Sequence, residues 1–469
     1  MPDNTAFDLT RRGFLATAGA SAITAAARPC RVGSSTRPPN IVYLFSDEHR
    51  WQSMSFTELP QVHTPNMARL AEEGAQSSHC ISNYPVCSPY RAILLTGRWP
   101  HETGVIDNDL PLRSSEVTLG TVFKEAGYRT GYIGKWHLWG PRAEPFGFDH
   151  SLIWDKTNIH WDSSVYHPAN GEPVTPRGYN ATLMTDQALD FIEVNQHDPF
   201  FLVVSWNPPH ATFTDAPESK QALYPRDYLP YRPNWRTGDA PGNDSGNQKI
   251  FKDNGWPHYE GYHAHISAID DELGRVLLKL EELGLQENTI VVYTSDHGSQ
   301  FGSHGVGGKR QPFDESIRVP FLIRWPGRIP EGETTDALFG SIDIMPTLCA
   351  LASIDVPETC RGNDFSGHFT GSGGPNSESQ FIMHIAKEKA SGKKNHPAPI
   401  FRGVRTRRHT YFMTDDGTPV LFDNRRDPYQ LENIAKSRRA RRVREECEAM
   451  TRAWLREAHD PFVLRGVRA

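Results

Sequence analysis

The segment around Cys87 has residue types at a spacing that could activate a nucleophile. Cys87 comes directly before a stretch that Pro89 is placed to open as a helix, and Arg91 follows Cys87 by one helical turn. Proline is tolerated in the first turn of a helix, where its missing N–H has no partner, and the free amides there favour an anion. The pattern predicts a reactive cysteine at a helix N-terminus. The alternative is an ordinary buried cysteine beside a helix cap.

Four apolar runs are each followed directly by polar side chains. Their β-branched and aromatic residues predict buried strands over residues 40–45, 129–133, 200–205 and 289–293. In open, mostly parallel α/β sheets, ligands bind at the carboxyl ends of the strands, so we expect the polar groups there to converge. In chain order these groups are Asp47, Glu48 and His49, then Lys135 and His137, then His210, and finally Asp296 and His297.

Alternating strands and helices over residues 38–370 predict the larger part of the fold. Residues 117–127 form a predicted helix before the second strand, and residues 259–284 carry apolar side chains at helical spacing before the fourth. Such β-α-β alternation predicts an α/β fold, with a large mixed, mostly parallel sheet sandwiched by helices.

A smaller C-terminal α+β subdomain is predicted at residues 380–469. Residues 371–379 are rich in Gly and Ser, a composition typical of a hinge. Short apolar runs separated by turns then predict an antiparallel sheet, and the tail from Lys436 predicts a packed helix with one apolar face. The predicted strands cover residues 380–385, 401–405, 410–413 and 420–422.

Two irregular segments are candidates for the walls of a substrate pocket. Residues 212–256 are rich in Pro, Asn, Asp and Gly and follow His210 immediately, which favours a lid. Residues 154–167 are rich in aromatic residues and histidine. Their rings could stack on a sugar, although simple hydrophobic packing explains them equally well.

Several motifs in this chain together resemble those of the type I sulfatases, which belong to the alkaline phosphatase superfamily. The first is Cys87-x-Pro89-x-Arg91, followed by Leu-Thr-Gly. The others occur in the family's order over nearly the whole chain after residue 40. They are Ser46-Asp-Glu-His-Arg50, the helix after Thr64-Pro65 with Thr64 as its N-cap, Gly134-Lys-Trp-His137, Pro209-His210, Ser295-Asp-His-Gly298, Gly308-Lys309 and Arg318–Gly327.

The resemblance implies a catalytic role for six residues. It implies that Cys87 is oxidised to Cα-formylglycine, whose hydrated aldehyde attacks sulfur, and that Arg91 holds this group in place. Lys135 and Lys309 would pair with sulfate oxygens. His137 would take a proton from the hydrated aldehyde, and His210 would protonate the leaving oxygen, with Lys309 as the alternative acid.

A divalent cation is implied by the same resemblance. Its ligands would be Asp47, Glu48, Asp296 and His297, together with the group formed from Cys87. Carboxylate oxygens suit Ca²⁺, the first choice, and the imidazole leaves Mn²⁺ and Mg²⁺ as alternatives. Many relatives carry aspartate at the position of Glu48 and asparagine at the position of His297.

The resemblance implies a sulfuric-ester hydrolase that removes sulfate from a sulfated carbohydrate or an aryl sulfate. His297 matches a subset of the superfamily linked to phosphonate and phosphate esters, so a hydrolase of those esters is the alternative. A non-catalytic binder of sulfated glycans is a third reading. The intact cysteine, arginine and carboxylates oppose it.

The N-terminus predicts export. Thr10-Arg11-Arg12-Gly13-Phe14-Leu15 precedes an alanine-rich stretch ending at Ala27, which resembles a twin-arginine signal peptide over residues 1–27. We therefore expect two partners during maturation, the twin-arginine translocase and a formylglycine-generating enzyme. The mature enzyme would be periplasmic or secreted.

Composition narrows the remaining classes of function. The 469 residues carry a net charge of −6, which opposes nucleic-acid binding, and no apolar stretch after the signal reaches membrane-spanning length. Of the six cysteines, Cys349 and Cys360 are the pair that proximity in sequence would favour for a disulfide, but sequence alone gives no geometry.

Overall fold

A computed structural model describes residues 37–463, apart from residues 141, 155–157, 163–164, 170, 237–257 and 386–397. Its centre is a nine-stranded mixed sheet in which the four predicted strands are adjacent and parallel. The order across the sheet is β11 (Glu333–Thr335), β2 (Ala75–Ser77), β10 (Phe321–Arg324), β8 (Thr289–Ser295), β1 (Asn40–Ser46), β7 (Phe200–Ser205), β4 (Arg129–Lys135), β5 (His150–Trp154) and β6 (Tyr166–Pro168).

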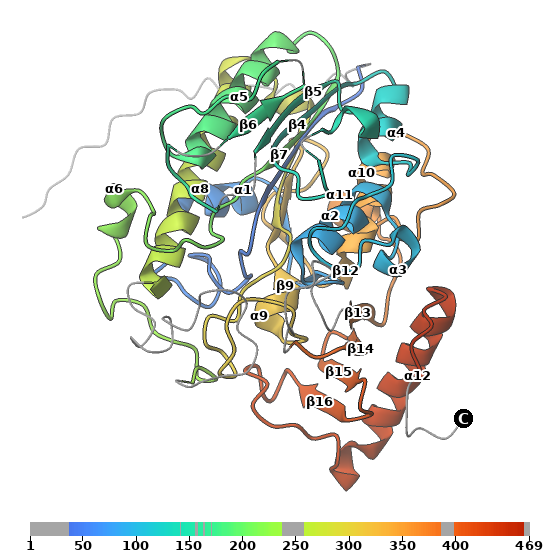
Figure 1. Ribbon diagram of the computed structural model, residues 1–469. Helices are drawn as coiled ribbons and strands as arrows, with labels where there is room; N and C mark the ends of the chain where they lie inside the picture. The colour runs from blue at the N-terminus through green and yellow to red at the C-terminus, as the bar shows by residue number, and fades with distance from the viewer. Residues whose placement is uncertain are drawn as a thin grey trace, which may run out of the picture. The chain divides into compact units, whose positions relative to one another are not determined.

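Helices cover both faces of this sheet (Figure 1). One face packs on α1 (Pro65–Glu72), α5 (Asn180–Val194) and α8 (His258–Glu282). The other face packs on α2 (Cys87–Thr96), α4 (Leu119–Glu125), α10 (Ile344–Leu351) and α11 (Ser366–Thr370), with the short α3 (Pro100–Thr103) after α2. Alternate β1 side chains divide between these layers, since Val42 and Leu44 face the first and Ile41 and Tyr43 the second. The predicted α/β sandwich is confirmed.

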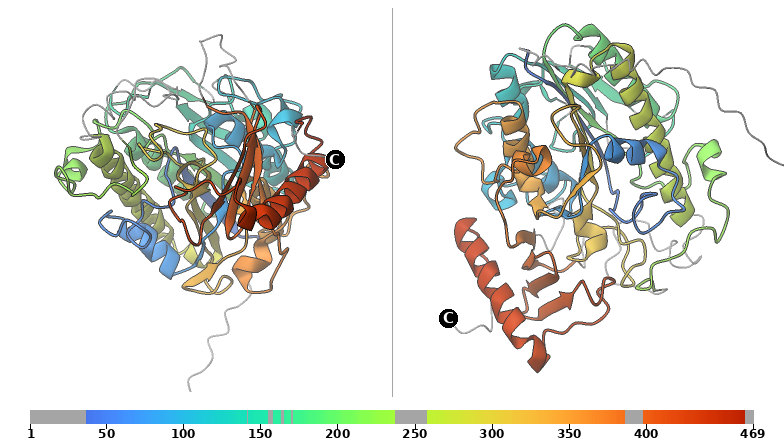
Figure 2. Two further views of the ribbon diagram at one scale, coloured as in Figure 1. Left: turned by 90° about the horizontal axis from the view of Figure 1, so that it is seen from below. Right: turned by 180° about the vertical axis from the view of Figure 1, so that it is seen from behind.

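A four-stranded antiparallel sheet follows the large sheet. It consists of β13 (Gln380–His384), β14 (Phe401–Arg405), β15 (His409–Thr414) and β16 (Pro419–Asp423), with α12 (Arg441–Glu457) packed against it (Figure 2). Trp454 of α12 stacks on Phe381 of β13 and contacts Trp99, which precedes α3. Residues 36–469 form one compact unit, and the boundary that we place at residues 371–379 stays a prediction.

Two helix starts differ from the prediction. The helix α2 begins at Cys87 itself, with Val86 as N-cap, so the cysteine lies in the first turn rather than before it. Thr64 takes the N-cap position of α1, but its hydroxyl accepts a hydrogen bond from the Ser55 amide instead of from the helix. The amides of Asn66 and Met67 donate to the carboxylate of Asp270 on α8, which does the capping from a distant part of the chain.

The predicted lid is only partly described. Over residues 212–236 it forms the short α6 (Glu218–Gln221). Tyr224 is buried and its hydroxyl shares a hydrogen bond with the hydroxyl of Ser267 on α8, whereas Tyr228 is exposed. Residues 237–256 lie outside the described residues, as does the predicted signal peptide at 1–27. The role of the segment as a lid stays a prediction.

Two further expectations concern a disulfide between Cys349 and Cys360 and the apolar character of the helices. Cys349 and Cys360 are free thiols rather than a disulfide; burial raises the pKa of each, to about 12 and about 11, which keeps them protonated and unreactive. Among the described residues, the helices lack the combination of length and apolar character needed to cross a bilayer.

Asp343 links the chain around Gly340 and Asn363 to strand β13 of the C-terminal sheet. Its buried carboxylate accepts hydrogen bonds from the amides of Gly340 and Asn363 and from Gln380 of β13, while burial raises its pKa to about 7. The folded protein therefore holds a proton here that the unfolded chain releases near pH 4, and this contribution to stability is lost as the pH rises to about 7. The unfolding free energy of the native protein, minus that of Asp343→Asn, should fall between pH 4 and pH 7 in urea titrations. A constant or rising difference would contradict this assignment.

Candidate active site

The carboxyl ends of the parallel strands bring the predicted polar residues together. Asp47, Glu48 and His49 directly follow β1, Asp296 and His297 directly follow β8, and all five side chains are buried. The start of α2 places Cys87 against them, and Lys135 ends β4. Residues 249 positions apart in sequence therefore meet because β1 and β8 are parallel neighbours, with Ser46 paired to Ser295.

Four of these residues present ligand atoms to one point. Asp47, Cys87, Asp296 and His297 each offer an atom that lies within 4.8 Å of the others. His297 Nε2 is 3.3 Å from Cys87 Sγ, 3.4 Å from Asp296 Oδ1 and 3.8 Å from Asp47 Oδ1. His297 Nδ1 lies 2.9 Å from the carbonyl oxygen of Gly298, which favours a tautomer with Nε2 free to bind a cation. Two carboxylates and one imidazole form a donor set that suits a divalent cation.

Arg91 connects the two aspartates of the site through hydrogen bonds. Its guanidinium donates to Asp47 Oδ2 at 3.1 Å and to Asp296 Oδ2 at 3.3 Å, and also to Ser205 Oγ at 2.7 Å. The side chain is fully buried, and its guanidinium carbon lies 4.9 Å from the ring centroid of Phe45. Because a buried cation needs partners on every side, these contacts fix the positions of both carboxylates.

Two lysines surround Cys87 with positive charge. Lys309 Nζ lies 3.2 Å from Cys87 Sγ, and Lys135 Nζ lies 2.5 Å from Asp47 Oδ2. Burial and Asp47 would raise the pKa of Cys87, but Lys309, Lys135 and His297 together lower it well below the usual value. The position is thus built to hold a negatively charged or strongly polarised group.

The pKa values of the two aspartates are shifted in opposite directions. Burial would raise the pKa of Asp47, but Lys135, His210, Lys309 and Arg91 lower it well below the usual value. Burial and the neighbouring Asp47 raise the pKa of Asp296 to about 7. Burial lowers the pKa of His297, but Asp296 and Cys87 together outweigh it and raise the value to about 9. The crowded carboxylates favour a cation between them.

Glu48 and His210 form a second part of the site. Glu48 Oε2 is 3.6 Å from His210 Nε2 and 3.6 Å from Lys309 Nζ, and burial raises its pKa. Glu48 thus groups with Asp47 and His210 rather than with Asp296 and His297. Burial, Lys309 and Lys135 lower the pKa of His210 to about 3.

His137 lies beside the start of α2. Its carbonyl oxygen accepts a hydrogen bond from the hydroxyl of Ser88, the residue after Cys87. Its Nε2 is 3.5 Å from Asp109 Oδ1, whereas its buried Nδ1 has no hydrogen-bond partner among the described residues. The predicted site residues therefore all lie at this end of the sheet, except His49, which turns away to Tyr293 and Ser53.

The sequence analysis missed several residues that shape the site. Ser205 ends β7 and could have been found by the same strand-end signal that identified the others. Asp109, beside His137, lies in an irregular loop and carries no such signal. In the residues 154–167 that we expected to line a pocket, His160 is buried and contacts Asp215 at 2.7 Å, and His265 of α8 contacts the same carboxylate at 3.2 Å. This network anchors the segment after His210 to the core.

Comparisons with known proteins agree with this geometry. A sulfatase family model matches residues 39–354, and a model for the C-terminal part of N-sulphoglucosamine sulphohydrolase matches residues 302–455. An ulvan-active sulfatase from Formosa agariphila is 34% identical over 91% of this chain and 83% of its own length. An N-acetylglucosamine-6-O-sulfatase from Bacteroides thetaiotaomicron is 27% identical over 85% of this chain and 83% of its own.

A solved structure shows the same fold. The crystal structure of YidJ, a candidate sulfatase from Bacteroides fragilis, superimposes with a TM-score of 0.79 at 28% identity, over 90% of this chain and 97% of the other. The family model covers well over half of the chain, and the 34% identical relative aligns over most of both sequences. This chain therefore belongs to the sulfatase family of enzymes.

Proposed function

We propose that this enzyme hydrolyses sulfate esters of a carbohydrate, using a Cα-formylglycine formed from Cys87 and one divalent cation. The single observation that supports this most strongly is the position of Cys87 Sγ, which lies 3.2 Å from Lys309 Nζ, 3.3 Å from His297 Nε2 and 3.7 Å from Asp47 Oδ1. A nucleophile at this point would meet cations and metal ligands on all sides. Attack at sulfur places negative charge on the sulfuryl oxygens, so such surroundings favour it.

The residues of the site fit both a formylglycine at residue 87 and a divalent cation. When formed, the formylglycine supplies a hydrated aldehyde as nucleophile, and the cation polarises a sulfate oxygen. Asp47, Asp296 and His297 would hold the cation. We keep Glu48 as a candidate ligand, although its carboxylate faces Lys309 and His210. Ca²⁺ is the first choice because the donors are mostly carboxylate oxygens, with Mn²⁺ and Mg²⁺ as alternatives.

The remaining side chains bind the substrate and move protons. Lys135 and Lys309 would pair with sulfate oxygens, because each carries its ammonium group at the edge of the metal-ligand group. Arg91 would orient the reacting group at residue 87 through its fixed contacts to Asp47 and Asp296. His137 would accept a proton through one ring nitrogen, with Asp109 near the other.

His210 is our candidate for the acid that protonates the leaving oxygen. Burial and the two lysines lower its pKa, and the negative charge of a bound sulfate ester would oppose the lysines and favour the protonated ring. His210→Ala should lower kcat for an alkyl sulfate by about 10²- to 10³-fold. It should lower kcat for nitrophenyl sulfate much less, because nitrophenolate leaves without a proton. Equal losses on both substrates would contradict the role and favour Lys309.

The substrate class rests on the relatives and on the chemistry of the site. The names of the two relatives described above specify ulvan and N-acetylglucosamine sulfate, which favours a sulfated carbohydrate. His297 keeps phosphonate and phosphate esters as the second candidate. Rates with matched aryl sulfate and aryl phosphonate esters separate the two, and a strong preference for the phosphorus ester would overturn our choice.

Export and maturation belong to the same proposal. Cys87 is 1% exposed in the folded chain, so a modifying enzyme would need to reach it before folding is complete. A twin-arginine signal at residues 1–27 would fit this order, because that pathway carries folded proteins. We therefore propose a periplasmic or secreted enzyme whose Cys87 is oxidised in the cytoplasm.

A further inference from the structure

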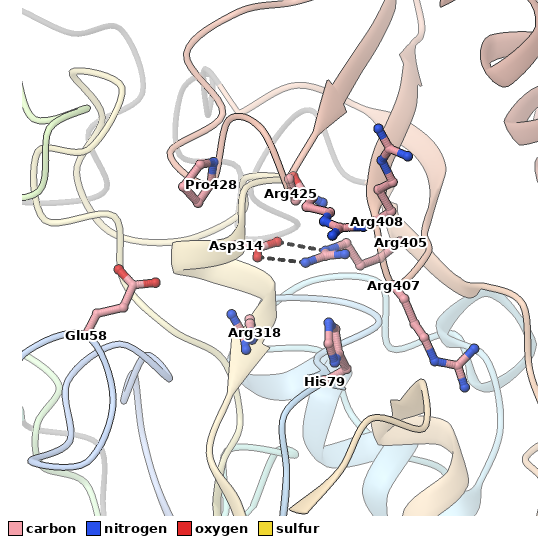
Figure 3. Close-up of a pocket in the computed structure, with 10 residues that line it drawn as sticks. Glu58, His79, Asp314, Arg318, Arg405, Arg407, Arg408, Arg425 and Pro428 are labelled. Atoms are coloured by element: carbon pink, nitrogen blue, oxygen red, sulfur yellow. Dashed lines mark hydrogen bonds and ion pairs between the residues drawn. The ribbon is translucent and has the colours of Figure 1, made fainter.

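A pocket rich in arginine lies between residues 314–318 and the turns of the C-terminal sheet (Figure 3). Its volume is about 360 Å³. We call it the arginine pocket, and its lining comes from α9 (Asp314–Ile317), β9 (Arg318–Val319), the turns around β14–β16 and two loops. The lining residues are Glu58, His79, Asp314, Arg318, Arg405, Arg407, Arg408, Asn424, Arg425 and Pro428.

The two carboxylates of the lining are already engaged. Asp314 accepts both of its hydrogen bonds from Arg405, at 2.9 and 3.0 Å, and the ion pair is buried. Glu58 stands at the far side of the pocket and pairs with Arg232, which lies outside it (Figure 3). Among the described residues, neither of these two carboxylates forms an ion pair with Arg318 or Arg425.

Two arginines of the lining carry unneutralised charge. In the part of the chain that the structure describes, Arg318 and Arg425 form no ion pair with a carboxylate, whereas Arg408 pairs with Asp423 and Arg407 with Asp336. The guanidinium of Arg318 lies 3.4 Å from the ring centroid of Trp51, and its Nε donates to the carbonyl oxygen of Ser78. One face of this group is thus covered by the indole.

The environment of Arg318 favours an anion. Burial, together with the neighbouring Arg405 and Arg232, lowers its pKa to about 10, against the opposing effect of Asp314 and Glu58. A guanidinium that stacks on an aromatic ring and lacks a carboxylate partner can donate two parallel hydrogen bonds to an oxyanion. Arg318 is half-buried, and its position in a concave pocket reduces the amount of water that screens this charge.

We propose that the arginine pocket binds a sulfate group of the substrate chain at a distance from the catalytic site, with Arg318 and Arg425 as its ligands. This rests on the proposed function for the nature of the substrate, a carbohydrate bearing more than one sulfate. The segment that lines the pocket also borders the catalytic site, because the Gly298 amide donates to the Ser316 carbonyl two residues before Arg318. A chain bound in the pocket would be held to the same enzyme while another of its sulfates is hydrolysed, which raises the effective concentration of substrate.

The test uses the exposed Arg425 and its neighbour Arg426. Arg425→Glu removes a pocket ligand, whereas Arg426→Glu makes the same charge change at a residue outside the pocket lining that only pairs loosely with Asp423, at 3.9 Å. Both exchanges are made in full-length Cys87→Ala protein, which keeps substrate from turning over. Binding of sodium sulfate and of dextran sulfate is measured by calorimetry, and Arg318→Lys is added as a second pocket variant.

We expect Arg425→Glu and Arg318→Lys to weaken dextran sulfate binding by about tenfold or more, and Arg426→Glu to change it by less than about twofold. In enzyme with native Cys87, Arg425→Glu should leave kcat for a small aryl sulfate unchanged. Equal losses for Arg425→Glu and Arg426→Glu would show a diffuse charge effect and overturn the proposal. Sodium sulfate binding that depends on Arg425, without any such dependence for the polymer, would overturn the anchoring role. If binding follows the prediction but sulfate esters are not hydrolysed, the pocket stands and the proposed function fails.

Discussion

Cys87→Ala should abolish sulfate-ester hydrolysis, with a loss in kcat of at least about 10⁴-fold. Cys87 Sγ lies within 3.7 Å of Lys309, His297 and Asp47, and a water that replaced it would lack the covalent attachment that aligns the nucleophile. Alanine is smaller than cysteine and does not disturb the first turn of α2, which begins at this residue. The measurement is kcat with a nitrophenyl sulfate and with a sulfated monosaccharide.

A matched control comes from another buried cysteine. Cys447 lies on α12 in the C-terminal part, and burial raises its pKa to about 12, so the thiol is inert. Cys447→Ala should retain kcat within about twofold of the native enzyme, since it contacts none of the site residues. Retention of most of the activity in Cys87→Ala would contradict a nucleophile at residue 87, whatever its chemical form.

Loss of the metal site should have the second largest effect. Asp296→Asn removes one negative charge from the group that would hold the cation, and it also weakens the ion pair with Arg91. We expect kcat/KM to fall by about 10³-fold or more, because a cation contributes several kcal/mol to stabilising charge on the sulfate oxygens. The bound metal, measured by elemental analysis, should fall from one ion per chain to much less than one.

Chelation provides the complementary experiment. Dialysis of the native enzyme against a chelator should remove activity, and added Ca²⁺, Mn²⁺ or Mg²⁺ should restore it, with the most effective ion identifying the natural one. Asp296→Asn should not recover in the same way. Asp270→Asn is the control, because that buried carboxylate caps α1 away from the site and should leave metal content unchanged. Full activity after complete removal of metal would exclude the cation from the mechanism.

Strand positions and the convergence of the site were predictable from sequence for one physical reason. Buried parallel strands are continuous apolar runs, so the predicted strand at 200–205 coincides with β7, and that at 289–293 lies within β8. Parallel neighbours then bring their carboxyl ends together, which places Asp47 beside Asp296 without any knowledge of the intervening chain. The helix at 259–284 was predictable from the helical spacing of its apolar side chains, although residues 259–270 of α8 are buried on all sides, polar ones included.

Other features depend on contacts between distant residues and leave no local pattern. The side chain that caps α1 is Asp270, which lies about 200 positions further along the chain. The sequence near α1 gives no sign of this contact, so Thr64 was predicted to be the cap. Asp215 lies between His160 and His265 only because three separate segments meet there. Glu48 follows Asp47 directly, yet its side chain faces Lys309 and His210, because the backbone at Glu48 adopts a positive φ of 78° and turns it away.

Mass spectrometry of the peptide that contains residue 87, isolated from active enzyme made in a host able to oxidise this cysteine, tests the central claim most directly. The account predicts an aldehyde at residue 87, which a hydrazine reagent would trap, in an amount that matches the fraction of active molecules. An unmodified thiol at residue 87 in fully active enzyme would contradict it.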